Sequence, residues 1–241
     1  MIALFTDFGL AGPYAGQMHA VLAQQAPGAR VIDLFHDVPS HDIRSAAYLL
    51  PACVRGFPPE TVFVCVVDPG VGGARRPVIL RADHRWYVGP DNGLFHMLSR
   101  RATETECYEI HWRAAKPSAS FHGRDLFAPV AAQLARGVLP ESTSALLTPP
   151  DGDWPDDLPR VLYIDRFGNA MTGLRAAQFP RASRLRIGNV TVGYARIYSE
   201  VVTGQGFWYE NANGLVEIAV NQGRASDVFG LGVGDILEVV V

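Results

Sequence analysis

Alternation between strand-like and helix-like runs is the feature of this sequence that most limits its fold. Apolar, strand-like runs cover residues 2–6, 29–35, 61–67, 76–82 and 86–89, and helical patterns cover 14–25, 42–50 and 124–137. Such alternation is typical of βαβ units built on a mostly parallel sheet. We therefore predict an amino-terminal α/β domain whose sheet is flanked by helices.

Two aspartates follow strand-like runs directly. The run 61–67, TVFVCVV, is almost continuously apolar and rich in β-branched residues, which predicts a strand covered on both faces. Asp68 comes directly after it, and Asp7 comes directly after the run 2–6. Ligands of open α/β sheets bind at the carboxyl ends of the strands, so both are candidate site residues. Asp7 fits a carboxylate for a ribose diol, with a turn cap as the alternative.

The composition changes near residue 148. Residues 148–159, TPPDGDWPDDLP, are dense in proline, aspartate and glycine and predict a linker. Beyond them, short strand-like runs are separated by turns, without a long helical pattern. We predict three parts: an α/β domain over 1–147, the linker 148–159, and a smaller all-β barrel domain over 160–241.

Composition excludes several classes of protein. With 48% hydrophobic residues, the chain of 241 residues is expected to be globular, and its formal net charge of −3 comes from scattered charges. Scattered charge argues against a nucleic-acid stripe or a membrane-surface patch. The first apolar run meets Asp7 too early for a signal peptide or a membrane span, so we expect a cytoplasmic protein. Cys53, Cys65 and Cys107 lack C-x-x-C spacing, which predicts reduced, structural thiols.

A cluster of histidines and aspartates raises the question of a metal site. The segment HDVPSHD contains His36, Asp37, His41 and Asp42. It offers no third ligand at helical spacing, so we expect hydrogen-bonded structural groups, with a metal site as the alternative.

Two further motifs lie at predicted ends of strands. In GPDNG, residues 89–93, Asn92 is a candidate helix N-cap. In FHGRD, residues 121–125, His122 precedes an amphipathic helix that we expect to end at Gly137. His122 is a candidate base, or the group that orients one, and a satisfied surface histidine is the alternative. Neither a P-loop nor a dinucleotide glycine fingerprint is present.

The ordered set of motifs resembles a known family. The motifs are TDFG at Thr6, DPGVGGARR at Asp68, GPDNG at Gly89, FHGRD at Phe121, IDRFGN at Ile164 and NGLVEIAVNQG at Asn213. Together they resemble the S-adenosyl-L-methionine (SAM) hydroxide adenosyltransferases, adenosine-forming SAM hydrolases related to the fluorinase and chlorinase enzymes. The resemblance spans nearly the whole chain. It implies an α/β domain followed by a small β-barrel, and hydrolysis of SAM to adenosine and L-methionine. It also implies a homotrimer with the site at the subunit interface.

The resemblance assigns the family's water-handling trio to Asp68, Arg75 and His122. Arg75 is preferred to its neighbour Arg76 because of the seven-residue step from Asp68. The halogenases carry tyrosines at the aspartate and histidine positions and a serine at the position of Gly123, so this chain resembles the hydroxide branch. In the implied mechanism Asp68 and His122 hold and deprotonate a water while Arg75 orients Asp68. SAM is then the substrate, and neither a cofactor nor a metal is needed.

The resemblance also assigns substrate contacts. The residues are Asp7 for the ribose diol, Asp165 for the methionine amine, Phe167 and Asn169 beside the adenine, Asn221 at the adenine edge, and Asn213 as a candidate for the methionine carboxylate. Two positions depart from the family pattern. Gly12 stands where many relatives carry a second acidic residue, and Ala212 stands where the halogenases use a serine for the methionine carboxylate. Methionine recognition therefore has to use the backbone, Asn211, Asn213 or another group.

Other functions remain open at this point. A sensor that binds SAM or adenosine without turnover fits the same binding residues. A halide-using relative is disfavoured because the carboxylate of Asp68 would repel an anion. A scaffold without a small-molecule site would leave the carboxylates after the strands unexplained.

Overall fold

The computed structural model describes residues 1–240, and the chain divides into two compact units between Gly152 and Asp153. This division falls inside the predicted linker 148–159. Strand β8, Leu158–Ile164, begins at the end of that segment, so the last two predicted linker residues are already strand. Each unit has its own core and is described by itself.

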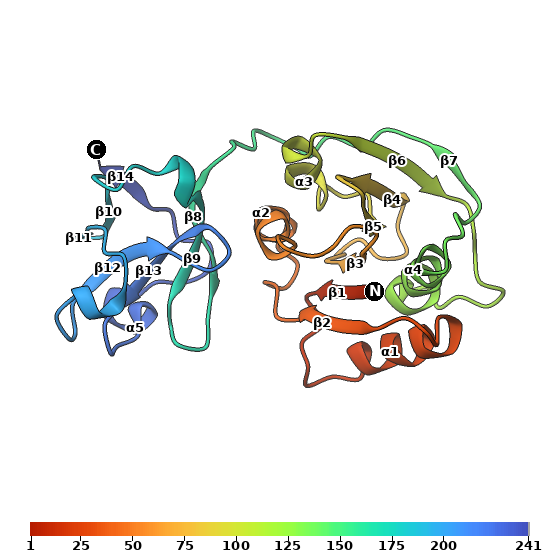
Figure 1. Ribbon diagram of the computed structural model, residues 1–241, viewed down its shortest axis with the longest axis horizontal. Coiled ribbons are helices and arrows are strands. Elements are labelled where there is room, and N and C mark those ends of the chain that lie inside the picture. The colour runs from red at the N-terminus through yellow and green to blue at the C-terminus, as the bar shows by residue number, and fades with distance from the viewer. Residues whose placement is uncertain (241) are drawn as a thin grey trace. The chain divides into compact units, whose positions relative to one another are not determined.

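A seven-stranded sheet forms the centre of the first unit (Figure 1). The strands are β1 (Ile2–Thr6), β2 (Val31–Phe35), β3 (Val62–Val66), β4 (Pro77–Ala82), β5 (Arg85–Pro90), β6 (Thr105–Ile110) and β7 (Ser142–Ser144). Their order is β2-β1-β3-β5-β4-β6-β7. The first four in this order are parallel, and β4 and β7 run antiparallel to their neighbours. The prediction of a mostly parallel α/β domain is confirmed.

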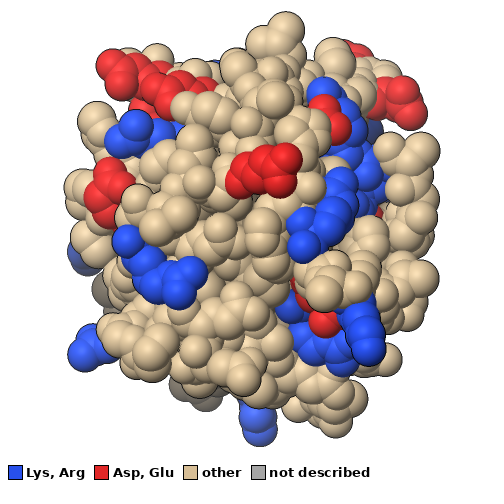
Figure 2. Space-filling model, turned by 90° about the vertical axis from the view of Figure 1, so that its right-hand side faces the viewer, with Lys and Arg blue, Asp and Glu red and all other residues tan. Residues whose placement is uncertain are grey.

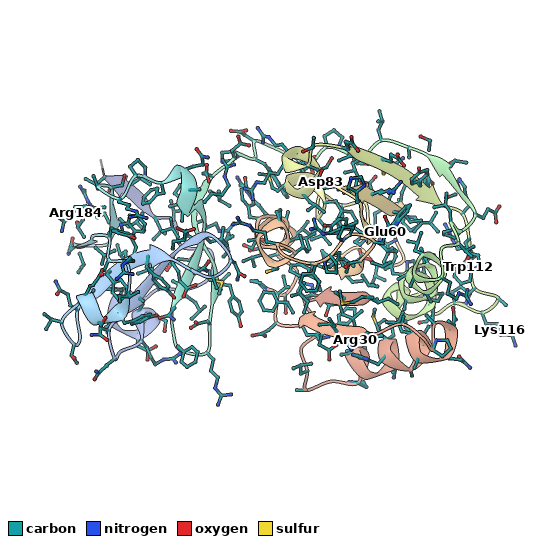
Figure 3. All side chains as sticks on the ribbon, in the orientation of Figure 1. Arg30, Glu60, Asp83, Trp112, Lys116 and Arg184 are labelled. Atoms are coloured by element: carbon teal, nitrogen blue, oxygen red, sulfur yellow. The ribbon has the colours of Figure 1, made fainter. Side chains whose placement is uncertain are left out.

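Two pairs of helices flank this sheet. Helices α1 (Tyr14–Gln25) and α4 (Ala128–Ala135) pack against each other, as do α2 (Ile43–Cys53) and α3 (His96–Arg101), and the two pairs lie on opposite sides of the sheet (Figure 1). Every residue of β3 is buried, as its apolar sequence predicts. Side chains fill the space between sheet and helices (Figure 3).

The hairpin between β4 and β5 explains why β4 is antiparallel. Its two turn residues, Asp83 and His84, have φ of 43° and 62°, the left-handed values that a tight two-residue hairpin turn requires. Asp83, labelled in Figure 3, also accepts hydrogen bonds from the backbone N–H groups of Thr103 and Glu104. The turn leaves room only for antiparallel pairing.

Two helix starts differ from the predictions. Helix α3 begins at His96, and Asn92 does not cap it: its side chain accepts from Leu94 N–H and donates to the carbonyl of Val67. The helix expected over 124–137 begins as a π-helical turn, η1 (Gly123–Phe127), and becomes α-helical at Ala128. Gly137 follows its C-cap with φ of 78°, as expected of a helix-ending glycine.

The second unit consists of two antiparallel sheets that are joined into a ring by one antiparallel and one parallel bridge. The strands are β8 (Leu158–Ile164), β9 (Ala170–Arg175), β10 (Arg184–Ile187), β11 (Val190–Val192), β12 (Gly206–Glu210), β13 (Leu215–Val220) and β14 (Glu238–Val240), and the helical turns are η2 (Ala176–Gln178), η3 (Tyr198–Glu200) and α5 (Ala225–Phe229). They form two sheets, β12-β13-β9-β8 and β11-β10-β14. Isolated bridges Arg160–Ile236 and Tyr194–Trp208 join the two ends of one sheet to the two ends of the other. This ring is the predicted small barrel, and Trp208 lies fully buried in its core.

Surface charge and cysteine chemistry agree with the composition. On the face shown in Figure 2, basic side chains lie beside acidic ones. Burial raises the pKa of Cys53 to about 12 and that of Cys107 to about 11, so these unpaired thiols stay uncharged near neutral pH. Among residues 1–240, no helix is long and apolar enough to cross a membrane.

Candidate active site

Asp7 and Asp68 lie at one edge of the first sheet. Strands β1 and β3 are parallel neighbours with Thr6 opposite Val66, so the residues that follow them emerge side by side. The backbone N–H of Asp7 donates to the carbonyl of Val66 at 3.4 Å. The sheet therefore places both carboxylates at its carboxyl edge, where α/β proteins bind ligands.

Asp68, Arg75 and His122 form one hydrogen-bonded cluster. Arg75 Nε donates to both carboxylate oxygens of Asp68, at 3.1 and 2.9 Å, and its Nη2 makes a short ion pair with Oδ2. The same Nη2 lies 2.8 Å from Nδ1 of His122. The side chains of Asp68 and Arg75 are only 4% and 10% exposed, so their attraction is weakly screened by water. The fold thus brings together three residues that span 54 positions of the sequence, from Asp68 to His122.

The arginine fixes the tautomer of His122. A guanidinium only donates hydrogen bonds, so Nδ1 of His122 must accept, and the ring hydrogen lies on Nε2. Burial and the positive charge of Arg75 lower the pKa of His122 below its usual 6.5, and the charge of Asp68 opposes that shift. His122 is therefore a neutral imidazole near pH 7, with Nε2–H as its remaining polar group.

Glycine 72 allows the loop that carries Arg75 to approach His122. It has φ of 78°, and a Cβ at this position would lie 2.6 Å from the carbonyl oxygen of Ala119. Residues 118–121 lead directly to His122, and they are tied to η1 by a 2.7 Å bond from Ser118 N–H to Asp125. Only glycine combines this backbone conformation with this contact.

A pocket of about 280 Å³ opens beside the cluster. Its lining residues are Asp7, Phe8, Tyr14, Ser40, His41, Val66, Asp68, Val71, Ser120, Phe121, His122 and Gly123. Phe8, Tyr14 and Phe121 contact each other with ring centroids 5.3 to 5.9 Å apart. A Cβ on Gly123 would approach Met18 Sδ, Phe121 and Phe8 at 3.2 Å each, so a serine there would disturb this aromatic wall. The pocket joins carboxylates to an apolar surface, as nucleoside sites do.

Arg76 has a different task from Arg75. Its Nη2 donates to Asp91 at 2.6 Å and to the carbonyl of Leu146 at 2.7 Å, while Asp91 also accepts from Thr148. Arg76 and the GPDNG aspartate therefore hold the start of the linker segment. Asn92, from the same motif, holds the carbonyl of Val67 at 2.9 Å, directly before Asp68.

The residues of HDVPSHD have separate hydrogen bonds. His36 is buried and bonds Thr6 at 2.7 Å and Asp33 at 2.9 Å. The backbone N–H of His41 donates to Asp7, and Asp42 caps helix α2 by accepting from Ser45. Within residues 1–240, no three His, Cys, Asp or Glu side chains are grouped in a way that would hold a metal ion.

A second candidate site lies in the second unit. Asp165 follows β8, and its two oxygens accept from the backbone and side-chain N–H groups of Asn169, at 2.8 and 3.0 Å. Phe167, between them, is 73% exposed. They line a pocket of about 740 Å³, the barrel pocket, with Arg166, Tyr198, Tyr209, Val220, Gln222, Gly223 and Arg224. Three of the predicted substrate residues are thus gathered around one cavity.

Asn213 and Asn221 are not among the residues that line the barrel pocket. Asn213 lies in the turn between β12 and β13, where its N–H donates to Asn211 Oδ1. The side chain of Asn221 donates to the carbonyl of Val201 at 2.6 Å. Their predicted substrate contacts remain predictions.

Sequence patterns did not single out the tyrosines of the barrel pocket. Tyr198 and Tyr209 come from a helical turn and a strand, and neither lies in one of the quoted motifs. Residue type and spacing carried no signal for them, because only the closed barrel brings their hydroxyl groups within 3.4 Å of each other.

Comparison with known proteins identifies the family of this chain. Residues 2–144 match the SAM hydroxide adenosyltransferase N-terminal domain, and residues 159–238 match the C-terminal domain of the same family. The chain belongs to this family.

Relatives match over almost the whole chain. An (R)-S-adenosyl-L-methionine hydrolase of Thermus thermophilus is 41% identical, covering 95% of each chain. One of Salinispora arenicola is 40% identical, covering 99% of this chain and 97% of the relative. An uncharacterized conserved protein from Thermotoga maritima has a solved structure that superimposes with a TM-score of 0.89 at 33% identity over the full length of both chains. The fold of both units is therefore shared with this relative.

Proposed function

We propose that this protein hydrolyses SAM to adenosine and L-methionine by attack of water on the ribose C5′ atom. The observation that carries the proposal is the Asp68–Arg75–His122 cluster beside the pocket at the carboxyl edge of the sheet. Relatives about 40% identical over nearly the full chain are SAM hydrolases, which supports the same reaction here. The protein is an enzyme that acts on a carbon–sulfonium bond.

The reaction needs help at the nucleophile rather than at the leaving group. A water oxygen forms a bond to C5′, the C5′–S bond breaks, and its electron pair neutralises the sulfonium. Methionine leaves as a neutral thioether without an added proton, so the chemistry requires no metal and no cofactor. The water must lose a proton, and a positioned base contributes roughly 10²- to 10⁴-fold to such a step.

The hydrogen bonds favour a different division of roles from the one expected from the sequence. Nδ1 of His122 is engaged by Arg75 and Nε2 already carries a hydrogen, so His122 is suited to donate to the water oxygen and hold it. Asp68 then takes the proton and passes it to solvent. Arg75 holds Asp68 in place through paired hydrogen bonds.

The remaining assignments extend the same proposal. Asp7 binds the ribose diol, Asp165 binds the methionine amine, and Phe167 and Asn169 contact the adenine. The pocket beside Asp68 and the barrel pocket each offer part of what SAM requires, so we propose a homotrimer in which pockets of neighbouring subunits enclose one substrate. A cytoplasmic location remains a prediction from the sequence.

Chromatography of purified protein incubated with SAM tests the activity. Equal amounts of adenosine and methionine should form in halide-free buffer and be lost in Asp68→Ala. A 5′-halo-adenosine that appears with chloride or fluoride would instead indicate a halogenase. Intact SAM after many hours, with binding still measurable by calorimetry, would indicate a sensor.

A further inference from the structure

A buried carboxylate lies under the barrel pocket, and the proposed reaction leaves it without a role. Glu217 is in the middle of strand β13 and only 2% of its surface is exposed. Its neighbours Val216 and Ile218 belong to the apolar barrel core. A carboxylate at such a position costs free energy unless it is hydrogen-bonded, so its presence requires an explanation.

Glu217 is joined to the barrel pocket by hydrogen bonds. Tyr209 donates its hydroxyl hydrogen to Glu217 Oε1 at 2.5 Å, and Tyr198 donates to the Tyr209 oxygen at 3.4 Å. Asn211 donates its side-chain amide to Oε2 at 2.7 Å. Tyr198 and Tyr209 both line the pocket that contains Asp165. The chain of hydroxyl groups therefore runs from the interior of the barrel to the wall of the pocket.

The charges around the pocket are arranged by depth. Glu217 lies beneath it and Asp165 is half-buried, whereas Arg166 and Arg224 are exposed. The Arg224 guanidinium is directed to Asp227 and to the carbonyl of Arg166. The two carboxylates, Glu217 and Asp165, favour a cation in the pocket. The exposed Arg224 guanidinium is engaged elsewhere and does not pair with Glu217.

We propose that Glu217 is a specificity residue that, together with Asp165, makes the barrel pocket select a ligand with a positively charged end. This inference rests on the proposed function, because in SAM that end is the ammonium and sulfonium of the methionine portion. Glu217 does not touch the ligand; it acts on it through Tyr209 and through its charge. A neutral nucleoside gains nothing from this charge.

The proposal implies that binding depends on pH. Burial, assisted by the charge of Asp165, raises the pKa of Glu217, and the hydrogen bonds from Tyr209 and Asn211 oppose the shift. The titratable groups that face it are Tyr209 from β12, Tyr198 from η3 and Asp165 after β8. A cationic ligand stabilises the charged form of Glu217, so binding releases protons and tightens as pH rises through the raised pKa.

Calorimetric titration of the full-length protein tests this. SAM and adenosine are titrated at pH 5.5 and 7.5 into the Asp68→Asn variant, which is expected to bind SAM without hydrolysing it. The same titrations are made with the Asp68→Asn/Glu217→Gln double variant. Glu217→Gln should weaken SAM binding about tenfold at pH 7.5 and less at pH 5.5, while adenosine affinity changes less than about twofold. Glu210→Gln, an exposed carboxylate on the neighbouring strand β12, is the matched control and should leave both affinities unchanged.

The outcomes separate the two proposals. Equal losses for SAM and adenosine would mean that Glu217 only supports the fold, and unchanged SAM affinity would mean that its charge is irrelevant; either result overturns the inference alone. Absence of SAM binding to the Asp68→Asn parent, together with absence of turnover by the wild type, would overturn the proposed function instead. Tyr209→Phe keeps the aromatic ring and removes the hydroxyl group that bonds Glu217. It should therefore reproduce part of the loss of SAM affinity and leave adenosine affinity unchanged.

Discussion

At the scale of single residues, the two adjacent arginines differ in what they contact, and this difference is testable. Arg75→Lys replaces a guanidinium that bonds Asp68 and His122 at once by an ammonium that cannot do so with the same geometry. We expect kcat to fall by roughly 10²-fold, which is the lower end of the rate loss caused by removing a general base. The measurement is steady-state turnover of SAM.

Arg76→Lys is the matched control for this prediction. Arg76 pairs with Asp91 and the linker segment rather than with the cluster. We expect its kcat to stay within about twofold of wild type, while stability falls by about 1–3 kcal/mol because the buried Asp91 keeps a weaker partner. Equal losses of kcat in the two variants would contradict the assignment of Arg75.

The pH dependence of turnover follows from His122. Its pKa lies below the usual 6.5, and its Nδ1 must stay unprotonated to accept from Arg75. Activity should therefore persist somewhat below pH 6.5 and decrease at more acidic pH, where a second positive charge beside Arg75 disrupts the cluster. Because the unfolded chain binds this proton more readily, His122 also makes stability rise with pH up to about 6.5. A kcat/KM profile whose acidic limb is unchanged in His122→Gln would refute this account.

At the scale of elements, the glycine-rich loop after β3 is predicted to hold the cluster together. Gly72→Ala introduces a Cβ into left-handed backbone and against the carbonyl of Ala119. We expect stability to fall by about 1–3 kcal/mol beyond the cost of the backbone conformation, and kcat to fall with it. Thermal unfolding and turnover are measured on the same sample.

Gly137→Ala provides the control for that loop. Gly137 has the same φ of 78°, but a Cβ there would meet no atom within 4 Å. It should lose about 1–2 kcal/mol from the backbone conformation alone and keep its kcat. If both variants lose stability equally and both stay active, the contact with Ala119 does not position the site.

The strands and helices differ in how well they could be predicted from the sequence. Strands such as β1 and β3 and helices such as α1 could be predicted because each depends on a local apolar pattern and its flanking residues. The cluster was predicted from family motifs, since nothing local places Arg75 next to His122. The antiparallel direction of β4 comes from the two-residue turn at Asp83 and His84, which apolar periodicity does not encode. The π-helical turn before α4 and the position of Asn92 depend on tertiary contacts, which periodicity does not encode either.

At the scale of the whole molecule, the proposed substrate site uses residues from both units, which raises the question of which copies of the chain supply them. Asp68 belongs to the first unit and Asp165 to the second. The proposed trimer places these halves of each working site on neighbouring subunits. A within-chain site would use both halves of a single copy, and the two arrangements predict different activities for mixed assemblies.

Co-expression of Asp68→Ala with Asp165→Ala separates these arrangements. A between-subunit site takes its first unit from one subunit and its second unit from a neighbour. With equal, random assembly each of these is intact in about half of the cases, so about a quarter of wild-type activity should return. A within-chain site would return none. The double variant co-expressed with wild type is the control, expected to retain about a quarter of the activity for a between-subunit site and about half for a within-chain site. The measurement is turnover at subsaturating SAM, normalised to total subunits. Activity of about a quarter in both mixtures indicates a between-subunit site, whereas no activity in the first mixture and about half in the control indicates a within-chain site.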